Sequence, residues 1–286
     1  MELTNMAAIK ALLSKNGIVL TKARGQNFLI NPSVCPRMAD ECGVTERDGV
    51  LEIGPGIGVL TQELAKRAGK VVAIELDGGL IPILGETLKD FDNVRIIEGD
   101  ALKLDLKDII RREFGDRKVF VCANLPYNIS TKLVMALLEG EFGFESLTVM
   151  VQKEFAQRIT AEVGSRKSGA ITVGAAFLAD SEMLFDVSAG SFFPAPKVDS
   201  TVMKLTPYKN PPVRVKAREL FMKTVNAGFC QRRKTLQNSL SAALPVEKSK
   251  VAEILEGMGK SPLARVEELN LDELALLCDK LSEAIK

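Results

Sequence analysis

From residue 49 to residue 151, short apolar runs alternate with segments of helical periodicity, and this alternation constrains the fold more than any other feature. Each run is short enough for a strand and precedes a stretch with apolar residues every three or four positions. Such alternation is typical of a parallel sheet covered by helices on both faces. It predicts strands at Val50–Ile53, Val71–Ile74, Val94–Ile97, Val119–Cys122 and Leu147–Val151, with helices at Leu60–Arg67, Leu80–Lys89, Leu106–Phe114 and Thr131–Leu138.

The rest of the chain divides at the proline-rich stretch Pro207–Pro212. Before it, two helices (Lys153–Val163 and Gly169–Ala179) and two late strands (Met183–Val187 and Ser200–Leu205) are expected, the strands as antiparallel edges of the sheet. Beyond it, only helical patterns follow, at Val215–Phe229, Lys234–Ala243, Val251–Met258 and Leu271–Ile285. We therefore expect an α/β domain over residues 1–210 and a small all-helical domain over residues 211–286. The first residues, Met1–Gly17, read as an amphipathic helix in a partly flexible segment 1–30.

Composition excludes several classes of protein. The chain has no histidine, which removes His-based triads and the zinc deaminase signature. Its five cysteines are scattered and form no Cys-x-x-Cys pair, so neither a disulfide framework nor a metal site is expected. There is no apolar run of membrane-spanning length and no signal peptide. A cytoplasmic protein without a membrane partner is predicted, and with no sign of a dimer seam, a monomer.

Positive charge is concentrated in one segment. Residues 209–250 carry ten Lys or Arg but only two Asp or Glu, although the whole chain has a net charge of +1. A basic stretch of this kind is typical of a surface that contacts phosphates, the alternative being a solvated helical face. Its densest part, Arg232, Arg233 and Lys234, is the predicted contact.

A glycine-rich turn follows the first predicted strand. Glycines at 54, 56 and 58 stand between that strand and a helix, where they let a ligand approach the backbone closely. The spacing departs from the dinucleotide fingerprint and, with an acid before it, resembles the loop of S-adenosylmethionine enzymes. Glu75 and Asp100 end the next two strands, placed to accept hydrogen bonds from ribose hydroxyls and from an adenine amine.

The turn Asn124-Leu125-Pro126-Tyr127 carries the strongest chemical signal. Pro126 fixes its own φ and favours an extended Leu125, so the turn is rigid. It presents an amide oxygen, a backbone carbonyl and an aromatic ring together. This set suits an unpaired nucleobase with an exocyclic amine.

With these motifs in order, the chain resembles the ribosomal RNA adenine N6-methyltransferases. Three further segments are similar to the bacterial small-subunit adenine N6,N6-dimethyltransferases of the kasugamycin-sensitivity type: Gly25–Leu29, Phe192–Ser200 and Phe229–Leu236. The resemblance covers roughly residues 20–280. It implies a Rossmann-like class I methyltransferase sheet, S-adenosylmethionine as cofactor with S-adenosylhomocysteine as product, and an RNA-contacting helical domain.

The resemblance also implies roles for individual residues. The family's cofactor-contact positions match Asn27, Leu29, Gly54, Gly56, Gly58, Glu75, Asp100 and Asn124. Its target-base positions match Asn124, Leu125, Pro126 and Tyr127, with Phe192 closing on the base from the other side. The implied substrate is a pair of adjacent adenosines in a hairpin loop near the 3′ end of small-subunit rRNA, within an immature 30S-type subunit.

Two residues depart from the family pattern, and two other functions stay open. Arg24 replaces an apolar residue, and Ser168 stands where many relatives have tyrosine. Both lie outside the motifs that carry chemistry. The open alternatives are a large-subunit rRNA methylase that confers antibiotic resistance and a non-catalytic RNA-binding assembly factor.

Overall fold

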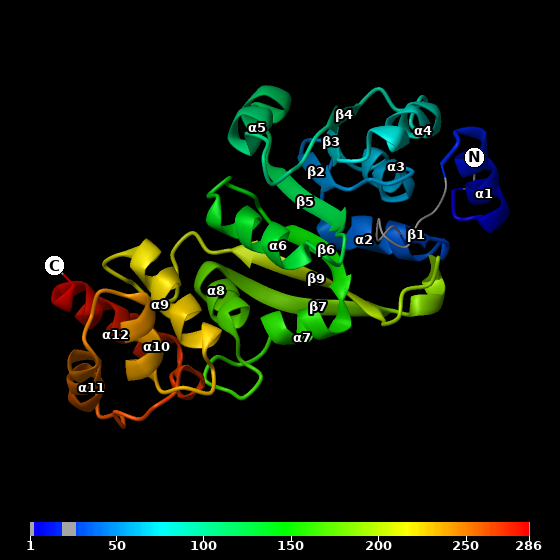
Figure 1. The fold of residues 1–286 in the computed structure, drawn as a ribbon. Coiled ribbons are helices and arrows are strands. Elements are labelled where there is room, and N and C mark those ends of the chain that lie inside the picture. Colours follow the sequence, from blue (N-terminus) through cyan, green and yellow to red (C-terminus); the bar gives the residue numbers. More distant parts are fainter. Residues whose placement is uncertain (1–2, 19–26, 286) are drawn as a thin grey trace. The chain divides into compact units, whose positions relative to one another are not determined.

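The computed structural model describes residues 3–18 and 27–285 (Figure 1). It divides into two compact units, Met1–Ala156 with Glu182–Pro207, and Gln157–Ser181 with Tyr208–Lys286. In the described residues, every helix is too short or too polar to cross a membrane.

A seven-stranded sheet in the order β4-β3-β2-β5-β6-β9-β7 is the framework of the first unit. The strands are β2 (Gly49–Ile53), β3 (Lys70–Glu75), β4 (Val94–Glu98), β5 (Val119–Asn124), β6 (Leu147–Gln152), β7 (Ala179–Val187) and β9 (Ser200–Pro207). The strands from β4 to β6 pair in parallel, and β9 pairs antiparallel with β6. The predicted α/β class, the five parallel strands and an antiparallel late strand are confirmed.

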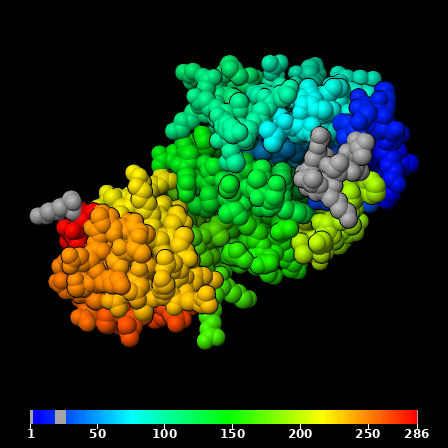
Figure 2. All heavy atoms as spheres, viewed as in Figure 1, coloured from blue at the N-terminus to red at the C-terminus, as the bar shows by residue number. Residues whose placement is uncertain are grey.

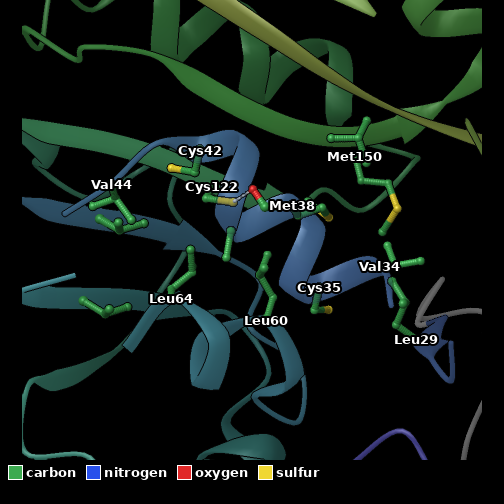
Figure 3. Packing of buried hydrophobic residues seen from close by; sticks show 14 of the residues in the cluster. Leu29, Val34, Cys35, Met38, Cys42, Val44, Leu60, Leu64, Cys122 and Met150 are labelled. Atoms are coloured by element: carbon green, nitrogen blue, oxygen red, sulfur yellow. Dashed lines mark hydrogen bonds between the residues drawn. The ribbon is translucent and has the colours of Figure 1, made fainter. Parts of the chain in front are cut away.

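One face of this sheet is covered by α2 (Val34–Cys42) and α3 (Val59–Ala65). Apolar side chains of the two helices, Met38 and Leu64 among them, pack on sheet residues such as Cys122 and Met150 (Figure 3). Helix α2 was not predicted from the sequence. It is short, and it ends at Gly43, whose φ of 76° stops the helix.

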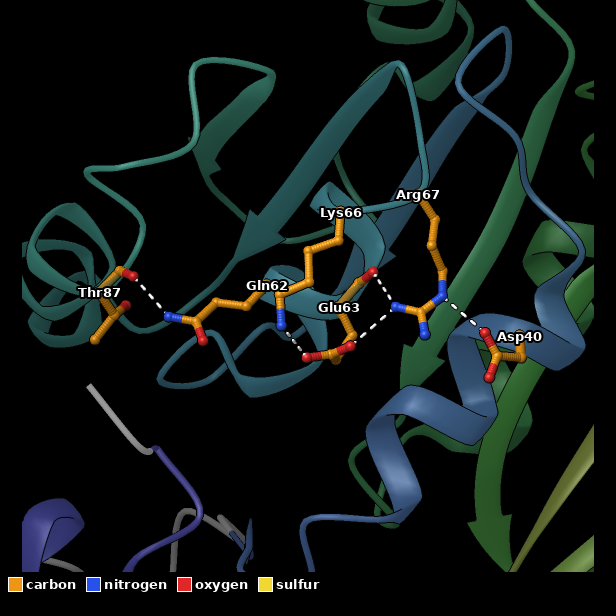
Figure 4. A network of polar contacts seen from close by, with 6 residues as sticks. All are labelled: Asp40, Gln62, Glu63, Lys66, Arg67 and Thr87. Carbon is orange, nitrogen blue, oxygen red and sulfur yellow. Dashed lines mark hydrogen bonds and ion pairs between the residues drawn. The ribbon is translucent and has the colours of Figure 1, made fainter.

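A polar network fixes α3, the helix that follows the glycine turn (Figure 4). The Arg67 guanidinium donates to Asp40 of α2 at 2.8 Å and to Glu63 at 2.9 Å. On the other side of the helix, the Gln62 amide donates to the carbonyl of Thr87 at 2.8 Å. The glycine turn is therefore held on a helix tied to both neighbours.

The remaining helices of the first unit are α1 (Met6–Lys15), α4 (Ile81–Thr87), α5 (Leu106–Phe114) and α6 (Ser130–Glu139). The N-terminal helix is shorter than predicted because the Asn5 side chain caps it, accepting from the Ala7 and Ala8 amides. Its buried face packs with Ile57 and Ile83. In Figure 2, the blue surface of α1 lies beside the cyan region that contains α4. An ion pair of 2.8 Å between Lys15 and Glu86 also joins the two helices.

Two short strands far apart in the sequence form a second sheet. In this sheet β1 (Phe28–Leu29) pairs antiparallel with β8 (Phe192–Phe193), so that Phe28 faces Phe193 and Leu29 faces Phe192. Because side chains alternate between the two faces of a strand, each pair shares a face. Leu29 and Phe192 point into the core cluster that contains α2, whereas Phe28 belongs to the cluster that contains α1.

The second unit contains α8 (Ala170–Leu178), α9 (Arg218–Cys230), α10 (Leu236–Ala243), α11 (Lys248–Gly257) and α12 (Leu271–Ala284). The four helices predicted beyond the proline-rich stretch are confirmed. The unit also includes residues 157–181, which we expected in the α/β domain. Phe177 of α8 packs on Phe221 of α9, with ring centroids 4.6 Å apart, and this contact draws α8 into the helical unit. Helix α7 (Lys153–Ile159) runs across the division.

Candidate active site

A cavity of about 510 Å³ opens at the carboxyl ends of β3, β2 and β5 in the first unit. Ligands of open parallel sheets bind at this edge, where the direction of the strand order reverses. Most of its lining residues come from four segments that are well separated in the sequence. The lining residues include Asn27–Leu29, Gly54–Ile57, Glu75–Asp77 and Asn124–Ile129.

The glycine turn forms the floor of the cavity. Gly54, Gly56 and Gly58 all have positive φ, at 71°, 61° and 91°, which other residues rarely adopt. Of the three predicted cofactor-contact glycines, Gly54 and Gly56 border the cavity and Gly58 does not. A Cβ at Gly58 would lie 3.1 Å from Thr87 Oγ1 and 3.2 Å from Leu88. The third glycine therefore allows close packing at the end of α4, a role that sequence spacing could not separate from ligand contact.

Glu75 lies where the sequence predicted it, on the wall beside the glycine turn. Its carboxylate accepts from the Gly56 amide at 3.2 Å and from the Asp77 amide at 2.8 Å. Burial raises the pKa of Glu75, and these backbone bonds act in the opposite direction. A carboxylate has about four acceptor sites, so two amides leave capacity for hydroxyl groups of a ligand.

Asp100 does not border the cavity, contrary to expectation. Its side chain accepts from the Leu102 amide at 3.0 Å, and Lys103 lies 3.5 Å from it. The strand before it, β4, stands at the edge of the sheet, beyond β3. The carboxylate thus stabilises its own turn in this structure, and its contact with an adenine amine stays a prediction.

The Asn124–Tyr127 turn forms the wall opposite Glu75, and all four of its residues line the cavity. The Leu125 amide donates to the Met150 carbonyl at 3.1 Å, which ties the turn to β6. Pro126 accepts from the Ile129 amide at 3.1 Å, and the Ser130 hydroxyl donates to the Tyr127 carbonyl at 3.2 Å. A Cβ at Gly54 would lie 3.8 Å from Pro126, so the turn and the glycine floor are neighbours.

The N-terminal motif closes one side of the cavity. Asn27 and Leu29 line it together with Phe28, and a Cβ at Gly56 would lie 3.6 Å from the Phe28 ring. The motif's first residues, Gly25 and Gln26, and the departure at Arg24 lie outside the described residues. The other departure, Ser168, is fully buried in the second unit.

Phe192 is not in the cavity wall, where its predicted stacking role would place it. It is only 2% exposed and packs with Leu29 and Val34 in the core. The reason is the β1–β8 register, which turns the Phe192 side chain inward with its partner Leu29. Stacking of this ring on a base would require it to leave the core, so the role stays a prediction.

Glu52 is a cavity residue to which the sequence assigned no role. It precedes the glycine turn, it is 1% exposed, and in the described part of the chain its Oε2 atom has no hydrogen-bond partner. Burial raises its pKa to about 8. A buried carboxyl oxygen without a partner is costly unless a ligand supplies one. The sequence signal that could have pointed to Glu52 is the position of this acid shortly before the glycine turn.

We expect Glu52→Gln to change how stability depends on pH. The unfolded chain loses this proton near pH 4.5 and the folded chain near pH 8. Between these values the folded state binds more protons, so its free energy of unfolding falls as pH rises, by up to about 1.4 kcal/mol per pH unit. Urea unfolding without cofactor should show a smaller fall across this window for Glu52→Gln. The exposed control Glu46→Gln should behave as wild type, and equal slopes for Glu52→Gln and wild type would contradict the assignment.

The basic segment lies in the second unit. Its three predicted phosphate-contact residues differ in their hydrogen bonds. Arg232 donates to the Arg166 carbonyl and to Glu267, both at 2.9 Å, so it holds the unit together. Arg233 and Lys234 are exposed.

Among the residues that the structure describes, no cluster of three or more metal-binding side chains occurs.

Comparison with known proteins places this chain in a family. A sequence model described as "Ribosomal RNA adenine dimethylase" matches residues 20–275. The chain belongs to that family. It is therefore a methyltransferase with the class I fold, as the sequence predicted.

Similar proteins agree with the family assignment. Ribosomal RNA small subunit methyltransferase A of Bacillus licheniformis is 42% identical over 280 residues, which are 96% of each chain. Among solved structures, a dimethyladenosine transferase from Plasmodium falciparum has a TM-score of 0.73 at 26% identity, covering 90% of this chain and 98% of that one. The 23S rRNA methyltransferase ErmE has a TM-score of 0.66 at 28% identity, covering 90% and 100%.

Proposed function

We propose that this dimethylase transfers methyl groups from S-adenosylmethionine to the N6 amines of two adjacent adenosines in a hairpin loop near the 3′ end of small-subunit rRNA. The observation that carries the proposal is the meeting of the Asn124–Tyr127 turn and the glycine turn in one cavity. The small-subunit relative of 42% identity supports the choice of RNA. A cytoplasmic monomer that acts on an immature subunit during its biogenesis fits the same proposal.

The residues present fit the cofactor. The backbone at Gly54 and Gly56 leaves room for close approach, and Glu75 would accept from ribose hydroxyls. The unpartnered Glu52 oxygen would pair with a hydrogen-bonding group of the ligand. Asn27 and Leu29 would close the site. When bound, S-adenosylmethionine supplies a methyl group already activated by its sulfonium.

Asn124 and Leu125 would then act on the nucleophile. An adenine amine is planar because its lone pair is shared with the ring. The Asn124 side-chain oxygen and the Leu125 carbonyl would accept its hydrogens, favouring a more nucleophilic nitrogen and stabilising the positive charge that develops on it. Holding the amine in line with the methyl group supplies much of the remaining acceleration. A strong base is not needed, because the proton becomes acidic only after attack, and the absence of histidine is compatible with this.

Tyr127→Ala should weaken engagement of the target adenosine. Stacking of a base on an aromatic ring contributes about 1–3 kcal/mol, so the rate at subsaturating RNA should fall roughly 5- to 150-fold. Tyr208, the other tyrosine of the chain, is exposed in the second unit and offers Tyr208→Ala as a matched control. An unchanged rate for Tyr127→Ala would remove stacking from the proposal.

The decisive experiment is methyl incorporation from labelled S-adenosylmethionine into unmethylated small ribosomal subunits, with the modified nucleoside identified. We expect N6,N6-dimethyladenosine at two adjacent positions. Large subunits, protein-free RNA and naked DNA serve as the competing substrates.

Large-subunit rRNA is the alternative substrate, and the relatives do not favour it, because the small-subunit methyltransferase is 42% identical to this chain and ErmE only 28%. Methylation of large subunits in preference to small ones would favour it. Binding to small subunits without any methyl transfer would favour the assembly-factor alternative.

A further inference from the structure

Tyr127 is tied to a residue 73 positions away in the sequence. Its phenolic hydroxyl lies 2.7 Å from the hydroxyl of Ser200, the first residue of β9. The Tyr127 ring is partly exposed at the cavity, whereas Ser200 is fully buried. This bond restricts the rotation of the Tyr127 ring.

Ser200 is itself held in a fixed place. It pairs in register with Gln152 of β6, and the Lys153 amide donates to the Asp199 carbonyl at 3.0 Å. The Asn124–Tyr127 turn is anchored on the same strand through the Leu125 amide and the Met150 carbonyl. The base of the turn is therefore fixed to β6 directly, and the tip of the tyrosine ring is fixed to β9, the strand paired with β6.

The neighbouring residue Asp199 fixes the opposite side of the site. Its carboxylate accepts from the Ala189 amide at 2.9 Å, at the start of the turn that leads into β8. The end of that turn, Ser191, accepts from the Ile30 amide at 2.8 Å, next to Leu29 of the cavity. The pair Asp199–Ser200 thus connects the aromatic wall with the N-terminal closing motif.

We propose that Ser200 is a positioning residue for methyl transfer, whose hydroxyl fixes the Tyr127 ring so that a stacked adenine presents its amine to Asn124 and Leu125. This inference rests on the proposed function and deepens it. The second methylation depends on the fixed position of the Tyr127 ring more than the first methylation does. An unmodified amine offers two hydrogens to the two acceptors, but a monomethylated amine offers only one. Stacking on the Tyr127 ring must then hold the base in place of the lost hydrogen bond.

Kinetics of Ser200→Ala test the proposal. We expect kcat to fall about tenfold on small subunits, with KM changed by less than about twofold, and monomethyladenosine to accumulate. Ser200→Thr keeps the hydroxyl and should restore most of the dimethylated product. Tyr127→Phe removes the other end of the same bond, so it should behave as Ser200→Ala does, and the double variant should be no worse than either.

A spectroscopic measurement tests the bond without RNA. The chain has two tyrosines and no tryptophan, so in a Tyr208→Phe background only Tyr127 reports. Burial raises the pKa of Tyr127 and the Ser200 bond lowers it. Adding Ser200→Ala should therefore shift phenolate formation, followed by ultraviolet absorbance after a rapid pH jump, to higher pH. The midpoint of thermal unfolding shows whether each variant is folded.

Three outcomes would overturn the positioning role while leaving the proposed function intact. The first is a folded Ser200→Ala enzyme that dimethylates at the wild-type rate, and the second is an unshifted phenolate titration. The third is additive losses in the double variant. A wild-type enzyme that leaves small subunits unmethylated would instead overturn the proposed function.

Discussion

Asn124→Ala should lower kcat for methyl transfer by roughly 10²- to 10³-fold, the loss seen when one preorganised electrostatic contact to a developing charge is removed. Asn124 ends β5, between the glycine turn and Tyr127, and it is only partly exposed. Its side chain would be the acceptor that faces charge on the nitrogen. Alanine keeps the turn, because Pro126 and the backbone bonds of Leu125 and Ile129 hold it. Cofactor affinity, measured by calorimetry, should fall only modestly.

A matched variant separates this role from a general effect on folding. Asn210 is exposed in the proline-rich stretch, and Asn210→Ala should keep the wild-type rate. Methylation of small subunits by Asn124→Ala at near-normal kcat would refute the assigned role. A parallel loss of cofactor affinity and kcat would instead show that Asn124 mainly binds the cofactor.

Reversing the charge of the exposed pair Arg233 and Lys234 should weaken binding to RNA roughly 10- to 100-fold at about 0.1 M salt. Each lost phosphate contact removes about 0.9 from the slope of log K against log salt, so the double variant should lower the slope by about 2. Arg232 is left in place because its bonds to Arg166 and Glu267 stabilise the unit. Binding to small subunits across a salt series measures both quantities.

The control is the same change of net charge elsewhere in the second unit. Lys248 and Lys250 belong to the basic segment but are exposed on α11, outside its predicted contact Arg232–Lys234, and reversing both should leave the salt slope close to wild type. If both double variants lower affinity equally, the effect is one of overall charge. If Arg233→Glu with Lys234→Glu keeps the wild-type slope, the basic segment is only solvated surface.

Much of the site was predictable because its signals are local. Strands β2, β3, β5 and β6 are short, mostly buried apolar runs, as their composition predicts, and β4 is a more exposed edge strand. The glycine turn and the Asn124–Tyr127 turn need residue types that only a few backbone conformations accept. Their meeting at one edge follows from parallel strands sharing a direction. The sequence alone therefore determined the α/β class, the cavity's position and its main residues, Glu75 included.

Contacts between distant segments decided the rest. The pairing of β1 with β8 buries Phe192 with Leu29, and the packing of Phe177 on Phe221 moves α8 into the helical unit. The bond from Ser200 to Tyr127 joins residues 73 apart. No periodicity or motif in the sequence specifies which distant residues meet. Side-chain packing selects the register in which two strands pair and the face that each side chain occupies. Only the tertiary structure could place these residues in the core or in the wall of the cavity.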